Sequence, residues 1–423
     1  GGVNPKKAGT THCGVPVYAS AVEAMKETSF DVSVLFIPPL GVKDAALDAI
    51  EAGAKNLCIL TEHVPVQDVM YFMAAAKEAG VFAPHAPVDC GGLGLGMVDR
   101  APVFEEAGYS LFGPVALNIN APDEGNIHML DHIASVAQRE KYLEPLARGD
   151  VRSAFAMTEP APGAGADPSM LATRATRVDG GWVVNGLKRF ITGADGAGFF
   201  ITMARTSGEP GGPGGATMFL MPGATEGLTV TRHVGMVDTS MLGGHCEVLY
   251  EDAFVPDEDV LGGVDEGFKY AQVRLGPARM THVMRWTGAV RRAHEVAVSY
   301  VAGREAFGSR LADQGMIQQL IADNEIDLAA TRALLMEACR VLDDGGRGNK
   351  ETSIAKTFAA EALHRVADRA QQMCGGLGVS TELPVAKIAR EVRPFRIYDG
   401  PSEVHRWSIA KRAVRAITAE QDA

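Results

Sequence analysis

The feature that most constrains the fold of this chain is a change in the spacing of its apolar residues, from a strand-like to a helical pattern, beyond its middle. Between residues 151 and 262, short stretches rich in β-branched and aromatic residues, such as RATRV, WVVNG and ATMFLM, alternate with glycine-rich turns. This spacing is typical of an antiparallel β-domain. From residue 265 onward, long stretches carry apolar residues at helical spacing, as in QQLIADNEIDLAATRALLMEACRVL. Two such different patterns in one chain exclude a single small domain.

The first part of the chain has two further patterns. Within residues 1 to 81, strand-like runs (VPVYA, DVSVLFIPP, NLCILTE) alternate with helical stretches, which indicates a parallel α/β unit. Residues 101 to 150 have helical spacing, with glycine and proline between the stretches. We therefore expect a multidomain α+β protein. Its predicted parts are a partial Rossmann-like α/β domain (1–81), a helical domain (82–152), an antiparallel β-domain (153–262) and a C-terminal helical domain (263–423).

Composition and charge narrow the class of protein. The chain has 423 residues, of which 46% are hydrophobic and 22% charged, and it has no unbroken apolar run of membrane-spanning length. The chain has 40 Lys and Arg and 52 Asp and Glu, which gives a net charge of -12, and its sequence contains no basic cluster with interleaved aromatic residues. We therefore expect small-molecule partners, no nucleic acid and no membrane, and a cytoplasmic location as the default.

No metal site is predicted. The six cysteines lie far apart without a CxxC pair, which suggests neither a zinc site nor a disulfide framework. His294 and Glu295 begin a sequence like the zinc motif HExxH, but Val298 stands where the second histidine is required. We therefore expect chemistry that does not depend on a bound metal ion.

Two glycine runs are candidates for ligand binding. CGGLGLG (90–96) follows a proline-rich stretch and no strand, so a tight turn is favoured over a dinucleotide-binding loop. MCGGLGV (373–379) ends a long predicted helix. Its glycines form either a plain helix C-cap or a set of backbone N–H groups exposed to a phosphate, and the run alone does not decide between them.

Five motifs in order resemble the acyl-CoA dehydrogenase family over residues 82 to 420. The motifs are FAMTEPAPGAGADPSM (155–170), GLKRFITGADGAGFF (186–200), GREAFGSRLADQGMIQQ (303–319), QQMCGGLGV (371–379) and IYDGPSEVH (397–405). The wording DGPSEVH, together with LGPARMTHVMR before it, is most similar to the branch whose catalytic base is Asp. The resemblance implies a helical domain, a β-domain and a C-terminal four-helix bundle, in agreement with these patterns.

The resemblance also implies FAD as cofactor and a homodimer or homotetramer as the assembly. An aromatic face would cover the flavin ring while hydroxyls and backbone N–H groups reach its polar edge. Carried over by motif, the residues at the ring are Phe155, Met157, Thr158, Phe190, Ile191 and Thr192. Those implied at the remainder of the cofactor, some of them from a neighbouring subunit, are Arg304, Phe307, Gln314, Gln318, Gln372, Gly375, Gly376, Ser402 and Glu403. Gln314 and Gln318 stand in for a family glutamine that is Gly315 here.

The family reaction removes a proton from the α carbon of an acyl-CoA thioester and a hydride from the β carbon, and electrons pass to an electron-transfer flavoprotein. The resemblance assigns the base to Asp399, because the other family position for a base is Ala278 here, which accepts no proton. A free carboxylic acid with a pKa of about 4 is a weak base, so burial against ligand must strengthen it. The implied substrate contacts are Ala166, Arg279, Tyr398 and Gly400.

Some alternatives remain open at this point. Arg279 is either an electrostatic support for catalysis or an ordinary helix-pair arginine. Ser402 and Glu403 also suit the start of the last helix after Pro401. Ala166 stands where many relatives have Ser, which removes one hydrogen bond near the acyl-CoA. An acyl-CoA oxidase, and a CoA-thioester-binding chimera with impaired catalysis, are the alternative functions.

The front of the chain resembles the CoA-binding domain of the α subunit of succinyl-CoA synthetase-type ligases. The resemblance rests on GGVNPKKAGTTHCGVPVYAS, SVLFIPP and CILTEHVP, and it places Lys7, Pro38, Pro39 and Thr61 near CoA-contacting positions. This copy lacks the first strand with its glycine loop and the later domain with the phosphorylated histidine. We therefore expect no ligase activity, and a genuine fusion, a fragment and an assembly error all fit the junction near residues 75–84.

Overall fold

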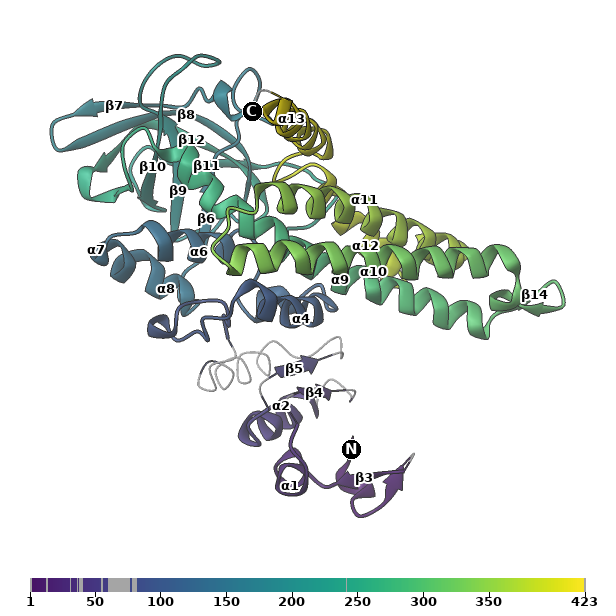
Figure 1. Ribbon diagram of the computed structural model, residues 1–423. Coiled ribbons are helices and arrows are strands. Elements are labelled where there is room, and N and C mark those ends of the chain that lie inside the picture. Colours follow the sequence, from purple (N-terminus) through teal and green to yellow (C-terminus); the bar gives the residue numbers. More distant parts are fainter. Residues whose placement is uncertain are drawn as a thin grey trace.

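The computed structural model describes residues 2–12, 14–30, 32–35, 37, 41–54, 56–59, 77, 82–240 and 242–421. Figure 1 shows a β-sheet domain at one end of a long helical bundle, a group of shorter helices beneath both, and the N-terminal segment beyond those helices. The element order confirms the expected succession of α/β, helical, β and helical parts.

The N-terminal segment contains a small α/β unit. Strands β4 and β5 pair in parallel around α2, as the alternating pattern predicts, but β3 pairs with β1 and β2 instead of joining them. The side chains of β3 and β4 are largely exposed. Among the described residues, the core cluster of this segment consists of the buried Ala21, Ala49 and Ala54 with Phe30 and Ala52 against it, so it offers little apolar area to unite the two sheets. Pro38, Pro39 and Thr61, which the resemblance places near CoA, lie outside the described residues. The elements are β1 (Gly2–Val3), η1 (Pro5–Lys7), β2 (Thr11–His12), β3 (Val15–Tyr18), α1 (Ala21–Glu27), β4 (Val32–Leu35), α2 (Val42–Glu51) and β5 (Asn56–Ile59).

The helical domain shares a core with one face of the β-domain. Phe82, Tyr142 and Leu146 pack in one cluster with Phe199 and Ile201 of the sheet. The glycine run at 90–96 forms the expected turn ahead of α4. The elements are η3 (Val88–Cys90), α4 (Met97–Gly108), α5 (Gly113–Ala116), α6 (Asp123–Ile133), α7 (Val136–Gln138), the π-helical turn η4 (Arg139–Leu143) and α8 (Glu144–Ala147).

The β-domain is a mainly antiparallel sheet with the strand order β11-β12-β8-β7-β9-β10-β13, and β6 pairs in parallel with β9. The glycine-rich stretch 208–216 connects β9 to β10, which pair as the expected hairpin. The sequence stretches WVVNG and GLKRFIT belong to one long strand, β8. The elements are β6 (Ser153–Ala156), η5 (Pro168–Met170), β7 (Arg174–Val178), β8 (Gly181–Thr192), β9 (Phe199–Arg205), β10 (Ala216–Pro222), β11 (Leu228–His233), β12 (His245–Pro256), η6 (Asp257–Asp259) and β13 (Val260–Leu261).

The C-terminal bundle is built around α9, which continues through Pro277 without a break. Helix α9 packs against α4, α6, α10, α11 and α12, so it joins the helical domain to the rest of the bundle. A single core cluster accordingly runs from α4 to α12. The elements are α9 (Gly267–Gly303), β14 (Glu305–Ala306), β15 (Ser309–Arg310), η7 (Leu311–Asp313), α10 (Gly315–Asp343), α11 (Asn349–Met373), η8 (Gly375–Val379), α12 (Val385–Val392), η9 (Arg393–Arg396) and α13 (Ser402–Gln421).

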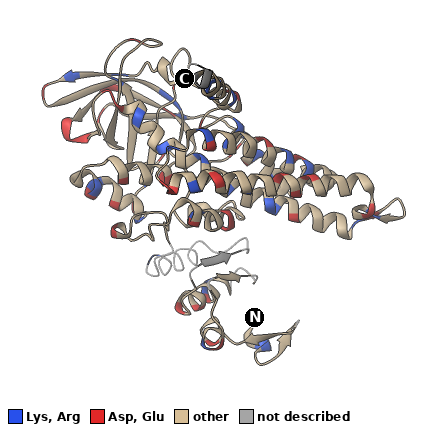
Figure 2. Cartoon of the chain, viewed as in Figure 1, with Lys and Arg blue, Asp and Glu red and all other residues tan. Residues whose placement is uncertain are grey.

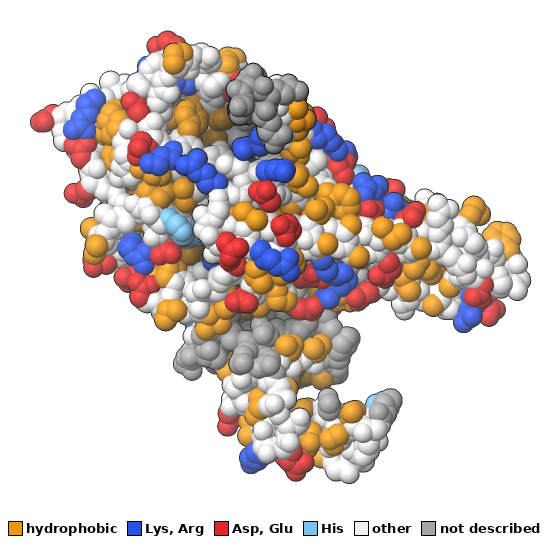
Figure 3. Space-filling model, in the orientation of Figure 1, with side chains coloured by type: hydrophobic (Ala, Val, Ile, Leu, Met, Phe, Trp, Pro, Cys, Tyr) orange, Lys and Arg blue, Asp and Glu red, His pale blue; other side chains and the backbone are white. Residues whose placement is uncertain are grey.

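Charges of both signs are distributed over the surface. Figure 2 shows Lys and Arg interspersed with Asp and Glu along the long helices. Figure 3 shows the same mixture on one face of the molecule, with hydrophobic side chains between the charged ones. Within the described part of the chain, no helix combines the length and the apolar character needed to cross a membrane, and no cluster of His, Cys, Asp and Glu has the arrangement of a metal site.

Candidate active site

One large cavity lies where the helical domain, the β-domain and the bundle meet. Its volume is about 1140 Å³, and its walls come from the segment before α6, the strands β6 and β8, helix α9 and the turn between η9 and α13. Residues more than two hundred positions apart in the sequence thus face one space. The predicted site residues that line it are Phe155, Met157, Thr158, Ala166, Phe190, Thr192, Arg279, Tyr398, Asp399 and Gly400.

The turn that carries Asp399 is held by three side chains that donate to its backbone. The carbonyl of Asp399 accepts from Nε of Arg279 at 3.0 Å and from Nε2 of His405 at 3.1 Å. The next carbonyl, that of Gly400, accepts from Nζ of Lys356 at 2.7 Å. Asp399 has a φ of +54°, in the left-handed region that only a few non-glycine residues adopt. Helices α9, α11 and α13 together therefore fix an uncommon backbone conformation at this residue.

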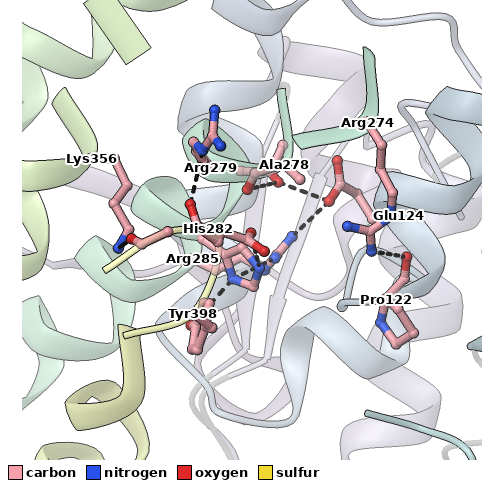
Figure 4. Close-up of polar contacts among 12 residues, drawn as sticks. Pro122, Glu124, Arg274, Ala278, Arg279, His282, Arg285, Lys356 and Tyr398 are labelled. Atoms are coloured by element: carbon pink, nitrogen blue, oxygen red, sulfur yellow. Dashed lines mark hydrogen bonds and ion pairs between the residues drawn. The ribbon is translucent and has the colours of Figure 1, made fainter. Parts of the chain in front are cut away.

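The donors behind this turn are themselves buried. Lys356 is fully buried, and burial lowers its pKa to about 8. Burial, with Arg279 and Lys356 nearby, lowers the pKa of His405 to about 4, so the ring is neutral at pH 7 and its Nε2–H is the donor. Ala278, which precedes Arg279 on α9 (Figure 4), is 3% exposed and offers only a methyl group. The structure therefore presents Asp399, and no side chain at 278, as the carboxylate on this wall.

The carboxylate of Asp399 faces His282. Its Oδ2 lies 3.4 Å from Nε2 of His282, and the two side chains are 16% and 11% exposed. The contact is not aligned as a hydrogen bond, and Oδ2 has no hydrogen-bond partner among the described residues. Asp399 thus has one carboxylate oxygen without a donor among the described residues, while the charges of Arg274, Arg279 and Lys356 act on it from nearby. Its position at the cavity allows it to meet a proton of a bound ligand.

The deep end of the cavity is rich in arginine. Figure 4 shows Arg274 and Arg285 on either side of Glu124. Arg274 Nε donates to Oδ1 of Asn126 at 2.7 Å, and Arg285 Nη1 donates to the carbonyl of Ile119 at 2.6 Å and lies 3.5 Å from Glu124 Oε2. Both guanidinium groups are thereby held in fixed positions. The motifs alone do not reveal this cluster, although the spacing of the arginines and His282 in RLGPARMTHVMR places them close together along one helix.

The β-domain wall exposes an aromatic ring at a strand irregularity. Phe190 has a φ of +61°, and its side chain is 45% exposed although it belongs to a central strand. Between the pairs Cys246↔Ile191 and Val248↔Lys188, β8 has one more residue than β12. Such a β-bulge turns a side chain away from the regular pleat. The bulge accounts for the position of Phe190 at the cavity, whereas Ile191 points into the sheet core and is fully buried.

Two threonine hydroxyls line the same wall. Thr158 Oγ1 donates to the carbonyl of Arg189 at 2.6 Å. His245 contacts Asp238 through Nε2 at 2.8 Å, and its Nδ1 lies 3.0 Å from Oγ1 of Thr192. A carboxylate only accepts, so Nε2 of His245 donates to Asp238, and in that tautomer Nδ1 accepts from Thr192. Both hydroxyls then use their protons within the protein and retain acceptor capacity for a ligand.

A buried ion pair supports this wall from behind. Lys188 Nζ lies 2.9 Å from Oε1 of Glu159 and donates to the carbonyl of Met157 at 3.0 Å. Glu159 also accepts from the backbone N–H groups of Ala172 and Thr173. Burial opposes ionisation of Glu159, but the charge of Lys188 and the hydrogen bonds outweigh it and hold the pKa of Glu159 at about 2. The pair thus ties the segment with Met157 and Thr158 to strand β8.

The other predicted cofactor residues lie away from the cavity. Ser402 is buried and donates from Oγ to Glu361 at 2.7 Å, at the start of α13, and Glu403 is exposed. The remaining residues lie where α9 turns into α10, near β14 in Figure 1, or in the last turn of α11 and just after it. Helix α11 runs back along α10. Phe307 is 96% exposed there. This distal set is Arg304, Phe307, Gln314, Gln318, Gln372, Gly375 and Gly376.

Family models match nearly the whole chain. Those of the N-terminal, middle and C-terminal domains of acyl-CoA dehydrogenase match residues 42–150, 154–253 and 265–414. The model of a CoA binding domain matches residues 1–63. The chain therefore combines a CoA-binding domain at its front with the three domains of a dehydrogenase, and the two front matches overlap.

Individual relatives agree with these models. The Mycobacterium tuberculosis protein named "Probable acyl-CoA dehydrogenase FadE2" is 38% identical over 79% of this chain and 83% of its own length. The (R)-benzylsuccinyl-CoA dehydrogenase of Thauera aromatica is 36% identical over 82% of this chain and 86% of its own. The solved structure of butyryl-CoA dehydrogenase from Megasphaera elsdenii has a TM-score of 0.73, 29% identity and coverage of 81% and 89%. The chain belongs to the acyl-CoA dehydrogenase family and is an oxidoreductase of that class.

Proposed function

We propose that this protein dehydrogenates an acyl-CoA thioester to the trans-2-enoyl-CoA, with FAD as its cofactor and an electron-transfer flavoprotein as electron acceptor, in the cytoplasm. The observation that carries the proposal is the position of Asp399, on a turn fixed by three donors and facing a large cavity. The reaction also requires a surface that binds a flat aromatic cofactor, and the β-domain wall of the cavity offers one.

The residues on that wall suit a flavin ring. Phe190 presents an aromatic side chain from a bulged strand, and Thr158 and Thr192 retain acceptor capacity beside it. An aromatic face with polar groups at its edge matches the amphipathic character of an isoalloxazine ring. We assign Phe155, Met157, Thr158, Phe190 and Thr192 to this contact. Bound there, FAD would supply the acceptor for the hydride from the β carbon.

Removal of the proton from the α carbon is assigned to side chains of the protein. Asp399 would take the proton from the α carbon, a step in which a positioned carboxylate contributes roughly a hundred- to ten-thousandfold. Arg279 would hold the base through its contact with the Asp399 carbonyl, which makes it a positioning residue. The family resemblance implies a backbone N–H at the base position as a donor to the substrate carbonyl. The loss of one such donor typically costs about 3 kcal/mol.

A direct test starts from the purified protein. We expect it to carry a yellow flavin that can be extracted as FAD, and we expect acyl-CoAs to bleach that flavin when oxygen is excluded. A series of acyl-CoAs of different chain length then defines the substrate. Rapid reoxidation of the bleached flavin by oxygen would identify an oxidase, whereas binding of acyl-CoA without bleaching would identify a CoA-thioester-binding protein with impaired catalysis.

We further propose that a second subunit completes the FAD site through the distal set. Phe307 is almost fully exposed, so Phe307→Ala should leave the urea midpoint unchanged while it weakens FAD binding by roughly tenfold, the effect of losing one interface anchor. FAD content per chain measures the binding, urea unfolding of the FAD-free protein measures the stability, and light scattering reports the oligomeric state. Val136→Ala is the matched control, because Val136 is an apolar side chain with 75% exposure on α7. Full FAD content in the Phe307 variant would contradict the proposal.

A further inference from the structure

We propose that His282 is a positioning residue for Asp399: it donates its Nε2–H to one carboxylate oxygen as a neutral ring and leaves the other oxygen to take the proton. The inference rests on the proposed function, because it assigns a role in the same proton transfer. It starts from the 3.4 Å contact between Nε2 of His282 and Oδ2 of Asp399, and from the position of His282 one helical turn after Ala278 on α9.

The tautomer of His282 follows from its other nitrogen. Nη2 of Arg285 lies 3.1 Å from Nδ1 of His282, and a guanidinium group can only donate. Nδ1 is therefore the acceptor, and the proton of the neutral ring is on Nε2. The hydroxyl of Tyr398, 3.4 Å from Nδ1, accepts from Nε1 of Trp286 at 2.5 Å and can donate its own proton to the same nitrogen. The ring is thus held from behind by donors alone.

The charges around His282 keep the ring neutral. It faces Arg274 and Arg285 on its own helix, Lys356 on α11, and Tyr398 and Asp399 on the turn. Burial, and then Arg285, Arg274 and Lys356, lower the pKa of His282 well below its usual range. This neutrality has a chemical use. An imidazolium ion would form a salt bridge with the carboxylate and weaken it as a base, whereas a neutral N–H fixes its orientation with a smaller loss of basicity.

A small movement would turn the contact between His282 and Asp399 into a hydrogen bond. The geometry between Nε2 and Oδ2 is short enough but not aligned, and Oδ2 has no other partner among the described residues. Catalytic hydrogen bonds of this kind commonly tighten when the ligand excludes water. The ring itself has little freedom, because it packs against Tyr398 and Phe395 with centroid distances of 4.8 Å and 5.8 Å. Alignment therefore requires movement of the carboxylate rather than of the histidine.

Two substitutions separate positioning from packing. In His282→Gln, the side-chain oxygen can accept from Arg285 while the amide N–H donates to Asp399, so this variant should rescue most of the function. His282→Leu has similar bulk but neither group. Both variants are compared with the wild type in FAD content, in the dissociation constant of acyl-CoA, in anaerobic flavin reduction across pH, and in exchange of the substrate α-hydrogens with deuterated water.

For His282→Leu we expect α-hydrogen exchange and flavin reduction to slow by about ten- to a hundredfold. The midpoint of the pH profile should move up by about one to two pH units, because the carboxylate anion loses a donor. FAD content and acyl-CoA affinity should stay within about twofold of the wild type. His282→Gln should remain within about fivefold in rate, with little shift of its pH midpoint. Equal losses in both variants, or an unchanged pH profile in His282→Leu, would overturn the proposal.

A measurement without turnover keeps this inference distinct from the proposed function. In protein labelled with ¹⁵N in its histidine rings, the His282 signals are identified by their absence from His282→Gln. We expect a protonated Nε2 and an unprotonated Nδ1 from pH 6 to pH 9. A ring that gains a second proton in this range, or that carries its proton on Nδ1, would overturn the inference even in an active enzyme. Failure of every acyl-CoA to bleach the wild-type flavin would count against the proposed function instead.

Discussion

Asp399→Asn is expected to retain FAD and acyl-CoA binding and to lose flavin reduction by about two to four orders of magnitude. The substitution removes the proton acceptor and changes little else. Asn tolerates the left-handed backbone that Asp399 adopts, and the carbonyl that accepts from Arg279 and His405 belongs to the main chain. Anaerobic stopped-flow absorbance of the flavin with saturating acyl-CoA measures the loss, and the flavin spectrum reports cofactor retention.

The chain offers a matched control for this variant. Asp252 also has a positive φ, +50°, and lies in β12 outside the cavity, where its Oδ1 accepts from Asn185. Asp252→Asn repeats the same substitution in the same backbone region and should leave flavin reduction unchanged. If Asp399→Asn reduced its flavin at the rate of the wild type, another carboxylate that lines the cavity, such as Asp238 or Glu391, would have to be the base.

Lys188→Met should destabilise the protein by about 3–5 kcal/mol, since it leaves the Glu159 carboxylate buried without its cation. The side chains of Lys188 and Glu159 are 0% and 2% exposed, so water cannot replace the lost partner. The shift of the urea midpoint measures this effect. Lys269→Met is the control, because Lys269 pairs with Glu266 at the surface with side-chain exposures of 67% and 45%. That variant should change the stability by less than about 1 kcal/mol.

The same pair predicts how stability depends on pH. The pKa of Glu159 is about 2 in the folded protein, against an ordinary value of 4.5 for a glutamic acid side chain, so the folded state binds this proton less readily than the unfolded state. The stabilisation is fully present above about pH 4.5 and is lost as the pH falls from there through 2. The wild type should therefore lose roughly 3 kcal/mol of unfolding free energy across this window from this group. Glu159→Gln should lack that part of the acid dependence.

The residues that we propose as the base and as the flavin contacts could be named from sequence, because each belongs to a short contiguous motif. The choice of Asp399 required only the motif at 397–405 and the recognition that residue 278 is Ala. Phe190 and Thr192 likewise belong to one strand motif, and the structure places both at the cavity. The order of the domains was equally accessible, because the period of the apolar residues changes from two to about 3.6 at the domain borders.

Tyr398 and Arg279 are among the residues that the family resemblance implies. The other groups around Asp399 could not be predicted, because they come from three helices. His282 and Tyr398 are 116 positions apart in the sequence, and Lys356 reaches Gly400 from a helix whose pattern is otherwise that of a packed core. Nothing local distinguishes a lysine that will be fully buried from one that reaches solvent. The strand order in the N-terminal segment could not be predicted either. Alternating strands and helices predict parallel strands, but not which strands become neighbours.

The way in which the turn at 397–401 is held has a consequence for what can occupy position 399. The three donors from the surrounding helices form hydrogen bonds with backbone carbonyl oxygens, which every amino acid possesses. None of these three bonds involves the side chain of Asp399. These hydrogen bonds therefore fix the backbone at position 399 without involving its side chain. The left-handed φ of +54° restricts the choice at position 399 instead, so Asn and Gly suit this backbone whereas a bulkier residue would strain it.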